Sequence, residues 1–451
     1  MGADAVMGRR QCVLGMAATM LTPAARACDS PVLVIGAGLA GLSVARHLHD
    51  AGQSVVVLEA RDRLGGRIHT SRAWPDLPMD LGASWIHGVQ GNPLTTLARE
   101  ARASWVATSC DASLALDTQG RAIKSDTATA ERLLRRATQW AERRSSDVSV
   151  WAALQAQPEW LRLAPAARQR VRHHGNATLE QEYGGALDEL SAWHGTDADG
   201  FEGVDGLFPQ GFDQLIQHAA RGLDVRLSTP VRSVGPGRVV LADGRSLSAQ
   251  VVVVTEPLGV LRAGHLRWEE ALSPARAQAL GALRMGLLNK CWLRFDAVHW
   301  PADVDWIEWL GPEPGRWAQW VSLARAARQP VLLGFHAAHE ARALESFSDR
   351  DTVASAHDAL RAMFGARFPA PVAAQVTRWG QDPWTLGSYS FNAVGTSGAT
   401  RKALAGAEWD GALWFAGEAT EPDYFGTAHG AWISGQRVAR SLLDGRCSRR
   451  S

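Results

Sequence analysis

The chain has 451 residues and a formal net charge of +1; 46% of its residues are hydrophobic and 21% are charged. This length suffices for a large two-domain protein, and the composition is that of a globular chain. The near-neutral charge gives no indication of a nucleic-acid partner. The five cysteines are scattered without a CxxC pair or a Cys/His cluster, so we expect no metal site, while the sequence leaves a disulfide open.

Residues 1–27 are typical of a signal peptide. The arginine pair at 9–10 precedes an apolar stretch over 12–21, and Ala-Arg-Ala at 25–27 fits a cleavage site. A twin arginine suits export of a protein that folds before transport, so we expect a periplasmic or secreted protein. The alternative is a cytoplasmic protein with an N-terminal tail, and Cys28 leaves a lipid anchor open. Because no stretch offers about eighteen continuous apolar residues, no membrane span is expected.

Residues 31–59 form a glycine-rich strand–helix–strand pattern. An apolar strand leads into Gly36, Gly38 and Gly41, a helix follows, and a second apolar strand ends at Glu59. Gly36 permits a tight turn, Gly38 lets the backbone approach a pyrophosphate, and Gly41 lets the helix pack against the strand. The Glu59 carboxylate is placed to accept hydrogen bonds from ribose hydroxyls. The pattern predicts a dinucleotide-binding unit, with the phosphates at the helix N-terminus.

The rest of the chain alternates between helical and strand patterns. Residues 83–200 read as mainly helical, since apolar residues such as Leu133 and Ala137 recur at three-to-four spacing. Short strands are then expected over 225–227, 231–234, 238–241, 250–255 and 411–417, and a last helix over 431–443. The fold class is therefore α/β (α+β overall), with a Rossmann-like nucleotide domain and a mixed sheet-and-helix domain. The nucleotide domain is predicted to be discontinuous, over 31–82, 205–265 and 401–445, and the substrate domain to occupy 83–204 and 266–400, with a ligand cleft between them.

Seven separate blocks resemble the flavin-dependent amine oxidase family, in the branch of polyamine oxidases and lysine demethylases. They follow the family's order, and the resemblance covers residues 31–445. The blocks are 59–67, 80–93, 187–191, 255–261, 285–290, 379–390 and 415–431.

The resemblance implies a non-covalent FAD and an oxidase activity. The expected reaction is oxidation of a polyamine of the spermidine and spermine class by hydride transfer to flavin N5. It would yield an aldehyde, an amine and hydrogen peroxide, with molecular oxygen as acceptor. The alternatives are a monoamine or L-amino-acid oxidase, an amine dehydrogenase with another acceptor and, more remotely, a non-catalytic FAD scaffold. The sequence does not indicate the oligomeric state.

The resemblance also assigns residues to the cofactor. Arg61 and Arg67 are expected at the pyrophosphate or flavin edge, with surface salt bridges as the alternative. The backbone of Val231 is expected against the adenine, and Glu418 near the ribityl or pyrophosphate group. The helix after His429 should point its positive end at the flavin C2 carbonyl. The full predicted set is Gly36, Gly38, Gly41, Glu59, Ala60, Arg61, Gly66, Arg67, Val231, Trp379, Gly417, Glu418, Thr427 and Ala428.

Lys290 is the first candidate for a catalytic side chain. It lies in the apolar run 286–293, where a lysine is costly to bury and where burial lowers its pKa. It also resembles the family lysine that holds a water against flavin N5. A strand lysine that reaches solvent is the alternative.

Further side chains are expected at the substrate. His87 resembles a histidine of the substrate tunnel and is expected to contact or deprotonate the amine, although a structural histidine is nearly as well supported. Tyr424 resembles a wall of the aromatic cage before the flavin and is counted with His87 and Lys290 as catalytic. Trp85, Tyr389 and Glu202 are assigned to the substrate. Other candidate tunnel carboxylates are Asp188, Glu189 and Asp205.

The chain departs from the family pattern at three positions. Glu256 stands where the family usually has an apolar residue, Ala419 where a histidine is common, and Trp432 where smaller residues are usual. The first departure is expected to alter the surroundings of FAD, and the other two to reshape the cleft.

Overall fold

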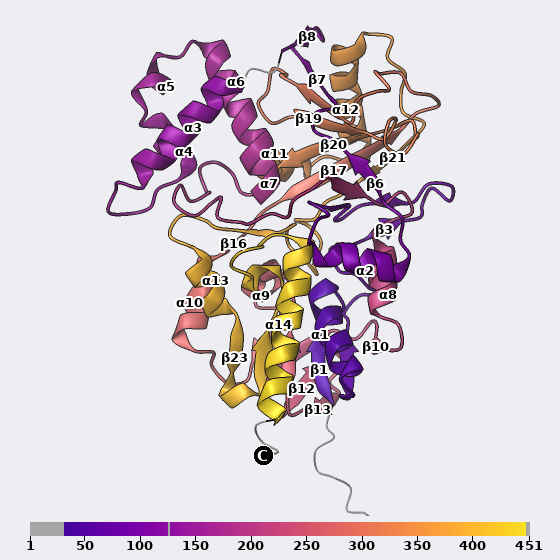
Figure 1. Cartoon of the computed structure of the whole chain (residues 1–451), viewed down its shortest axis with the longest axis vertical. Helices are drawn as coiled ribbons and strands as arrows, with labels where there is room; N and C mark the ends of the chain where they lie inside the picture. The colour runs from indigo at the N-terminus through magenta and orange to yellow at the C-terminus, as the bar shows by residue number, and fades with distance from the viewer. Residues whose placement is uncertain (1–30, 125–126, 448–451) are drawn as a thin grey trace, which may run out of the picture.

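The computed structural model describes residues 31–124 and 127–447, so the predicted signal peptide lies outside the described residues. Figure 1 shows two lobes stacked along the long axis. The lower lobe contains the first and last described segments, and the upper lobe contains most of the middle of the chain. Within the described residues, no helix is long and apolar enough to cross a membrane.

The lower lobe is built around a six-stranded sheet with the order β10-β2-β1-β14-β24-β23. The first five strands pair in parallel, and β23 is antiparallel to β24. The strands are β1 (Val32–Ile35), β2 (Val55–Leu58), β10 (Asp224–Arg226), β14 (Val252–Val254), β23 (Gly406–Glu408) and β24 (Leu413–Phe415). One sheet is thus assembled from four distant segments. The exact residue ranges predicted for the two domains stay a prediction.

Alternate residues of the central strands enter two different cores. Val34 and Val57 pack beneath helices α1 (Leu39–Asp50) and α14 (Ala428–Cys447), which lie side by side (Figure 1). Leu33 and Val56 point to the opposite face, where a mixed four-stranded sheet covers them. Because both faces are covered, the central strands are continuous apolar runs. The covering sheet contains β11 (Val231–Gly235), β12 (Arg238–Leu241), β13 (Ser246–Ser248) and β15 (Arg267–Trp268).

The upper lobe is built around a seven-stranded sheet with the order β21-β17-β20-β19-β18-β7-β8. On β17, Cys291 and Leu293 pack against helix α12 (Asp349–Phe364), whereas Trp292 points to the opposite face and a second core. The period of two places Lys290 on the same face as Trp292. The strands are β7 (Ser113–Leu116), β8 (Ala122–Ile123), β17 (Leu288–Arg294), β18 (Trp306–Trp309), β19 (Gln319–Ser322), β20 (Val331–Ala337) and β21 (Ala373–Val376).

A helical subdomain extends from the upper lobe, at the upper left of Figure 1. Leu133 and Ala137, which set the predicted helical periodicity, are buried in its core. Its helices are α3 (Ala128–Ala141), α4 (Val150–Gln155), α5 (Pro158–Arg162) and α6 (Pro165–Gly175). Short elements complete the fold: β3 (Thr70–Ser71), β4 (Met79–Asp80), β5 (Trp85–Ile86), β6 (Val106–Thr108), β9 (Asp205–Leu207), β16 (Arg284–Met285), β22 (Ser390–Phe391), α2 (Pro93–Ala101), α7 (Gln181–Tyr183), α8 (Asp213–Ala219), α9 (Leu258–Ala263), α10 (Pro274–Ala282), α11 (Ala338–Leu344) and α13 (Gly398–Leu404).

Two predicted elements differ from the observed ones. The segment 83–200 is not helical throughout, because β5 to β8 lie between residues 85 and 123. Of these, β5, β6 and β7 pair with distant strands, and β8 pairs with β7. The last helix begins at Ala428, three residues before the predicted start. There the Thr427 hydroxyl oxygen accepts the Gly430 backbone N–H at 2.9 Å, a side-chain cap for the first turn.

Candidate active site

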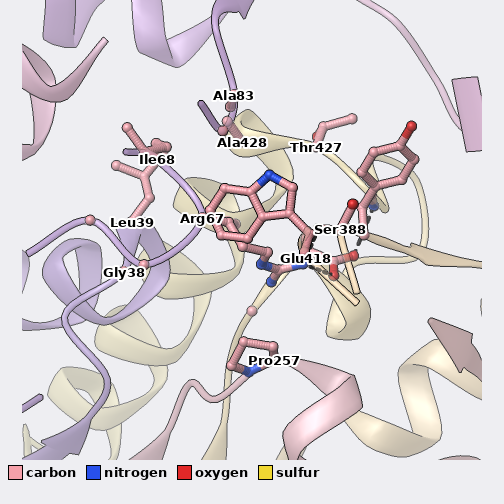
Figure 2. A pocket seen from close by; sticks show the side chains of 18 of the residues that line it. Gly38, Leu39, Arg67, Ile68, Ala83, Pro257, Ser388, Glu418, Thr427 and Ala428 are labelled. Atoms are coloured by element: carbon pink, nitrogen blue, oxygen red, sulfur yellow. Dashed lines mark hydrogen bonds and ion pairs between the residues drawn. The ribbon is translucent and has the colours of Figure 1, made fainter. Parts of the chain in front are cut away.

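A long cavity runs from the turn after β1 to the face of β17. Its empty volume is about 2120 Å³, which includes the part that is open to solvent. The ends of β1, β2, β14 and β24 form one part of its wall, and β17, β18 and β20 of the upper lobe form another. In Figure 2, Gly38, Leu39 and Ile68 lie on one side of the cavity, and Ser388, Glu418 and Thr427 on the other. The space therefore continues from a dinucleotide turn into the second lobe.

Most of the residues predicted from the sequence line this one cavity. Gly41, Tyr424 and Glu202 do not belong to its lining, and Glu202 is exposed. The predicted residues that line it are Gly36, Gly38, Glu59, Ala60, Arg61, Gly66, Arg67, Val231, Trp379, Gly417, Glu418, Thr427, Ala428, Lys290, His87, Trp85 and Tyr389. Their individual roles stay predictions.

The first turn of the cavity requires its glycines for two different reasons. Gly36 has a φ of +102°, which disfavours side chains, and a Cβ on Gly41 would lie 2.0 Å from the carbonyl oxygen of Gly36. Gly41 thus serves the packing of α1 and does not reach the cavity itself. A Cβ on Gly38 would meet no heavy atom within 4 Å, so this glycine faces open space. That space is what a pyrophosphate would need beside the backbone.

Glu59 organises the loop around this turn. One carboxylate oxygen accepts the Ala37 backbone N–H at 2.7 Å, and the other accepts the Arg61 backbone N–H at 2.9 Å. Each carboxylate oxygen has a second acceptor site, so Glu59 can still receive ribose hydroxyls from the cavity. Arg61 itself pairs with Asp382 at 2.6 Å across the cavity wall. Its predicted contact with the pyrophosphate stays a prediction.

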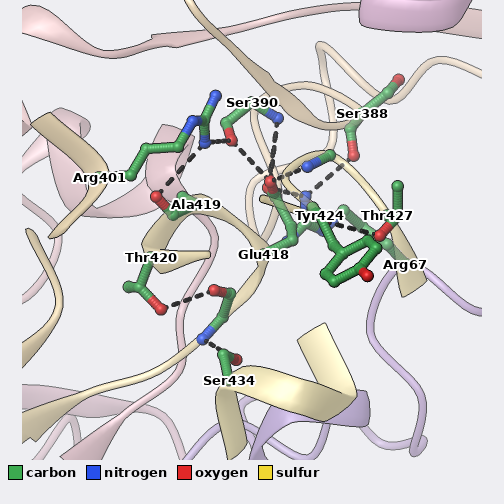
Figure 3. Close-up of polar contacts among 12 residues, drawn as sticks. Arg67, Ser388, Ser390, Arg401, Glu418, Ala419, Thr420, Tyr424, Thr427 and Ser434 are labelled. Carbon is green, nitrogen blue, oxygen red and sulfur yellow. Dashed lines mark hydrogen bonds and ion pairs between the residues drawn. The ribbon is translucent and has the colours of Figure 1, made fainter. Parts of the chain in front are cut away.

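Glu418 is the centre of a buried polar network (Figure 3). Its carboxylate accepts the Arg67 guanidinium at 2.7 Å, the Ser390 hydroxyl at 2.6 Å and the Gly426 backbone N–H at 3.0 Å. Burial raises the pKa of Glu418, but the nearby charges of Arg67 and Arg401, with these hydrogen bonds, lower it further, so its pKa lies below the usual value. Glu418 therefore stays ionised and holds Arg67 at the cavity. The alternative of a surface salt bridge does not apply to Arg67, because its partner is 4% exposed.

The last helix presents its N-terminal end to the cavity. Ala428, His429 and Ala431, from the first turn of α14, all line the wall. The first backbone N–H groups of a helix carry partial positive charge and lack partners within the helix. This end of α14 can therefore stabilise negative charge on a ligand, as the resemblance predicted.

Lys290 is buried, with 6% of its surface exposed, and its ammonium group has three oxygen partners. Nζ donates to the Gly82 carbonyl oxygen and the Ser84 hydroxyl oxygen, each at 2.5 Å, and more weakly to the Asp80 carbonyl oxygen at 3.3 Å. Burial lowers the pKa of Lys290, and the charge of the Asp80 carboxyl opposes this. The three acceptors explain how a lysine can lie in this apolar run, and they contradict the alternative of a lysine that reaches solvent.

His87 and Asp205 form a hydrogen-bonded pair on the cavity wall. The antiparallel pairing of β5 with β9 brings the two residues opposite each other, and His87 Nδ1 lies 3.1 Å from Asp205 Oδ2. The protein atoms that surround the cavity partly desolvate His87 and lower its pKa, but the hydrogen bond and charge of Asp205 outweigh this effect, and the pKa is raised. The side chain of His87 is 63% exposed, so its other ring nitrogen can meet a ligand.

Two aromatic rings pack against His429, which lines the cavity. Tyr424 stacks on Phe201 with ring centres 5.0 Å apart, and His429 meets both rings edge-on. Tyr424 thus supports the cavity from behind His429, and its predicted role in an aromatic cage stays a prediction. The Tyr389 hydroxyl donates to the Gln181 carbonyl oxygen, and burial raises its pKa. Tyr389 therefore offers the cavity a ring face, not a titratable group.

Sequence reasoning missed several residues of this site. Ser84 lies in a quoted block, but nothing in the sequence indicated that it would hold Lys290. Arg401 is fully buried over the ring of Phe425, at 4.0 Å from its centre, and acts on Glu418 from an element that reads as an ordinary polar helix. Glu182 lines the cavity and contributes to the raised pKa of His87. These contacts join distant segments and leave no local signal.

The cavity fits a dinucleotide cofactor by three observations. Gly38 leaves open space beside the backbone, Glu59 retains acceptor capacity at the ribose position, and α14 points its positive end inward. His429 Nε2 and Glu256 Oε2 are buried without a hydrogen-bond partner, as expected of groups that a bound ligand would satisfy. The fold and the site define an oxidoreductase of the dinucleotide-dependent class, with a buried lysine beside its substrate end.

Comparison with known proteins identifies the family. A model of the flavin containing amine oxidoreductases matches residues 39–443. The chain is 33% identical to polyamine oxidase 4 of Oryza sativa subsp. japonica over 440 residues, which cover 92% of this chain and 89% of the relative. It is 33% identical to probable polyamine oxidase 4 of Arabidopsis thaliana, over 91% of this chain and 86% of the relative. It is also 33% identical to lysine-specific histone demethylase 1 homolog 3 of Oryza sativa subsp. japonica, over 91% of this chain but 54% of that relative.

This chain belongs to the flavin-containing amine oxidoreductase family. These findings confirm the predicted family and the mixed two-lobed fold. They also confirm that the cofactor is FAD and that the protein is an oxidoreductase acting on amines. Non-covalent attachment of FAD stays a prediction.

Proposed function

We propose that the protein is an FAD-dependent polyamine oxidase. The observation that carries the proposal is one cavity that joins the FAD turn to a buried lysine and a histidine–aspartate pair, in a chain similar to polyamine oxidases over most of its length. Bound there, FAD supplies the two-electron oxidation of the carbon next to the amine nitrogen, and oxygen as the final acceptor would be reduced to hydrogen peroxide. Water would then cleave the resulting imine to an aldehyde and a shorter amine.

The chain's own residues prepare the amine for this oxidation. Asp205 and Glu182 place negative charge on the cavity wall, where it attracts the cationic nitrogens of a polyamine. His87 is hydrogen-bonded to Asp205 and can accept a proton from the reacting ammonium group. The amine must lose that proton before the adjacent carbon can be oxidised, because the nitrogen lone pair is needed for the imine. Lys290, with its lowered pKa, can hold or relay a proton beside Ser84 and Trp85.

The test is to mix the purified protein with spermidine without oxygen and follow the flavin absorbance. Rapid bleaching supports polyamine oxidation. Persistent yellow colour with spermidine and spermine, but bleaching with a monoamine or an L-amino acid, would overturn the polyamine assignment and retain the amine oxidoreductase. Admitting oxygen after bleaching tests the acceptor: recovery of the yellow colour with one peroxide per amine supports an oxidase, and absence of recovery supports a dehydrogenase.

We also propose export through the twin-arginine segment, on the basis of residues 1–27 alone. Cell fractionation and N-terminal sequencing of the native protein test this. A processed chain outside the cytoplasm supports the proposal, and an unprocessed cytoplasmic chain contradicts it.

A further inference from the structure

Glu256 lies at the cofactor turn, two residues beyond the end of β14. Thr255 precedes it and ties the end of β14 to the end of β1: its backbone N–H donates to the Ile35 carbonyl oxygen at 3.0 Å, and its hydroxyl donates to the same oxygen at 2.7 Å. Glu256 lines the cavity together with Gly36, Gly38 and Glu59. Pro257, the next residue, marks this part of the wall in Figure 2. The carboxyl group is therefore held at the phosphate and ribose end of the cavity, away from Lys290 and His87.

The carboxyl group of Glu256 lacks a partner among the described residues. Its Oε2 is buried without a hydrogen bond, and no cation of the described chain pairs with it. The Ala37 and Arg61 backbone N–H groups donate to Glu59, not to Glu256. Burial, and then the negative charge of Glu59, raise the pKa of Glu256 to about 7. Two acids thus share one wall of the cavity, and Glu256 keeps its proton to a much higher pH than an ordinary glutamic acid does.

An unpartnered buried carboxyl group is costly, because buried polar groups in folded proteins nearly always have hydrogen bonds. The site faces a cavity that receives phosphate and hydroxyl oxygens of a dinucleotide. An ionised carboxylate would repel a phosphate there, whereas a neutral carboxylic acid has an O–H that can donate.

We propose that Glu256 is a cofactor-binding residue that donates a hydrogen bond from its neutral carboxyl group to an oxygen of the FAD pyrophosphate or ribose. Bound FAD then satisfies the carboxyl group that the protein leaves unpartnered. The retention of FAD becomes sensitive to pH, because ionisation of Glu256 removes the donor and adds a negative charge beside Glu59. The sign is definite: affinity is full below the pKa of Glu256 and falls as pH rises through it.

The test uses holoprotein and measures the release of FAD by the rise in flavin fluorescence from about pH 6 to about pH 9. The variants are E256Q, which keeps a donor that does not ionise, and E256L, which restores an apolar residue. E142Q, at an exposed position on the distant helical subdomain, is the matched control. We expect release from the wild type and from E142Q to accelerate by about tenfold over this range, and release from E256Q to stay near its value at low pH.

E256L separates the effect of losing the hydrogen-bond donor from the effect of the negative charge, because it has neither, whereas E256Q keeps a donor. We expect it to release FAD independently of pH but several-fold faster than E256Q, because it has no donor. An infrared difference spectrum gives a second readout: the band of a protonated carboxyl should change on FAD release in the wild type and be absent from E256Q. The proposal is overturned if E256Q shows the same pH dependence as the wild type, or if E256L retains FAD as well as E256Q does.

Discussion

The ammonium group of Lys290 lies 2.5 Å from the hydroxyl oxygen of Ser84, a residue 206 positions earlier in the chain. The contact joins β17 of the upper lobe to the loop that enters β5. The Ser84 hydroxyl oxygen is one of three oxygen partners of the Lys290 ammonium group. Without such partners, a buried cation would be costly in an apolar strand. The position of Lys290 in the cavity therefore depends on a segment far from β17 in the chain.

The first prediction concerns this lysine. K290M should lower the rate of flavin reduction by about 10² to 10⁴, because the group that holds or relays a proton is lost. Anaerobic stopped-flow absorbance measures this rate directly. S84A is the matched variant: it keeps the ammonium group, removes one acceptor and should lower the rate less than K290M. Unchanged reduction in K290M, with the flavin still bound, would show that the assigned role is wrong.

The pair of His87 and Asp205 predicts a displaced pH profile. Asp205 raises the pKa of His87, so D205N should lower it, and His87 then becomes neutral at a lower pH. If neutral His87 accepts the substrate proton, the rising limb of kcat/KM against pH should move to lower pH in D205N. An NMR titration of the His87 ring gives the pKa independently of activity. A limb that does not move, although the ring titrates lower, would remove His87 from the reaction.

Two glycines of the cofactor turn should respond differently to alanine. G41A should destabilise the protein itself, because its Cβ would lie 2.0 Å from the Gly36 carbonyl oxygen. G38A should leave the thermal unfolding of the FAD-free protein unchanged, since Gly38 has an ordinary extended conformation and open space around it. It should nevertheless weaken FAD binding by about tenfold or more, because the added methyl occupies the space beside the pyrophosphate. Equal unfolding temperatures for the two FAD-free variants would contradict this difference.

The network around Glu418 predicts a large loss of stability. E418Q removes the charge that compensates Arg67 and the fully buried Arg401, at a cost of about 3–5 kcal/mol in the free energy of unfolding. Urea unfolding measures the difference. D243N is the control, because it breaks the exposed pair with Arg245 and should change little. A similar small change in both variants would show that the buried network is not stabilising.

The stability contributed by Glu418 should also depend on pH. Its pKa is lowered in the folded protein, so the contribution is complete above the usual pKa of a glutamate. It is lost as pH falls through the lowered value. Urea unfolding of the wild type and E418Q should therefore converge in acid and diverge toward neutral pH. A constant difference across that range would contradict the assignment of an ionised Glu418.

Much of the cofactor site could be predicted from short stretches of sequence. The spacing of Gly36, Gly38 and Gly41 between apolar strands indicates a dinucleotide turn, since each glycine answers a steric demand of its own neighbourhood. The same holds for the buried run of β14, whose residues are apolar because both faces of the sheet are covered. The strands between residues 85 and 123 were missed because they are short and because three of them, β5, β6 and β7, pair with strands far away in the chain.

The sequence by itself determined the turn, the strands that lead into it and the family blocks, because backbone sterics and hydrophobic periodicity act over a few residues. Only the tertiary structure decided which polar groups meet. Arg67 and Glu418 are 351 residues apart, and His87 and Asp205 are 118 apart, yet each pair shares a hydrogen bond on the cavity wall. Such pairs form when two lobes pack and strands find their register, and a short contact between distant side chains leaves no periodic trace in the chain.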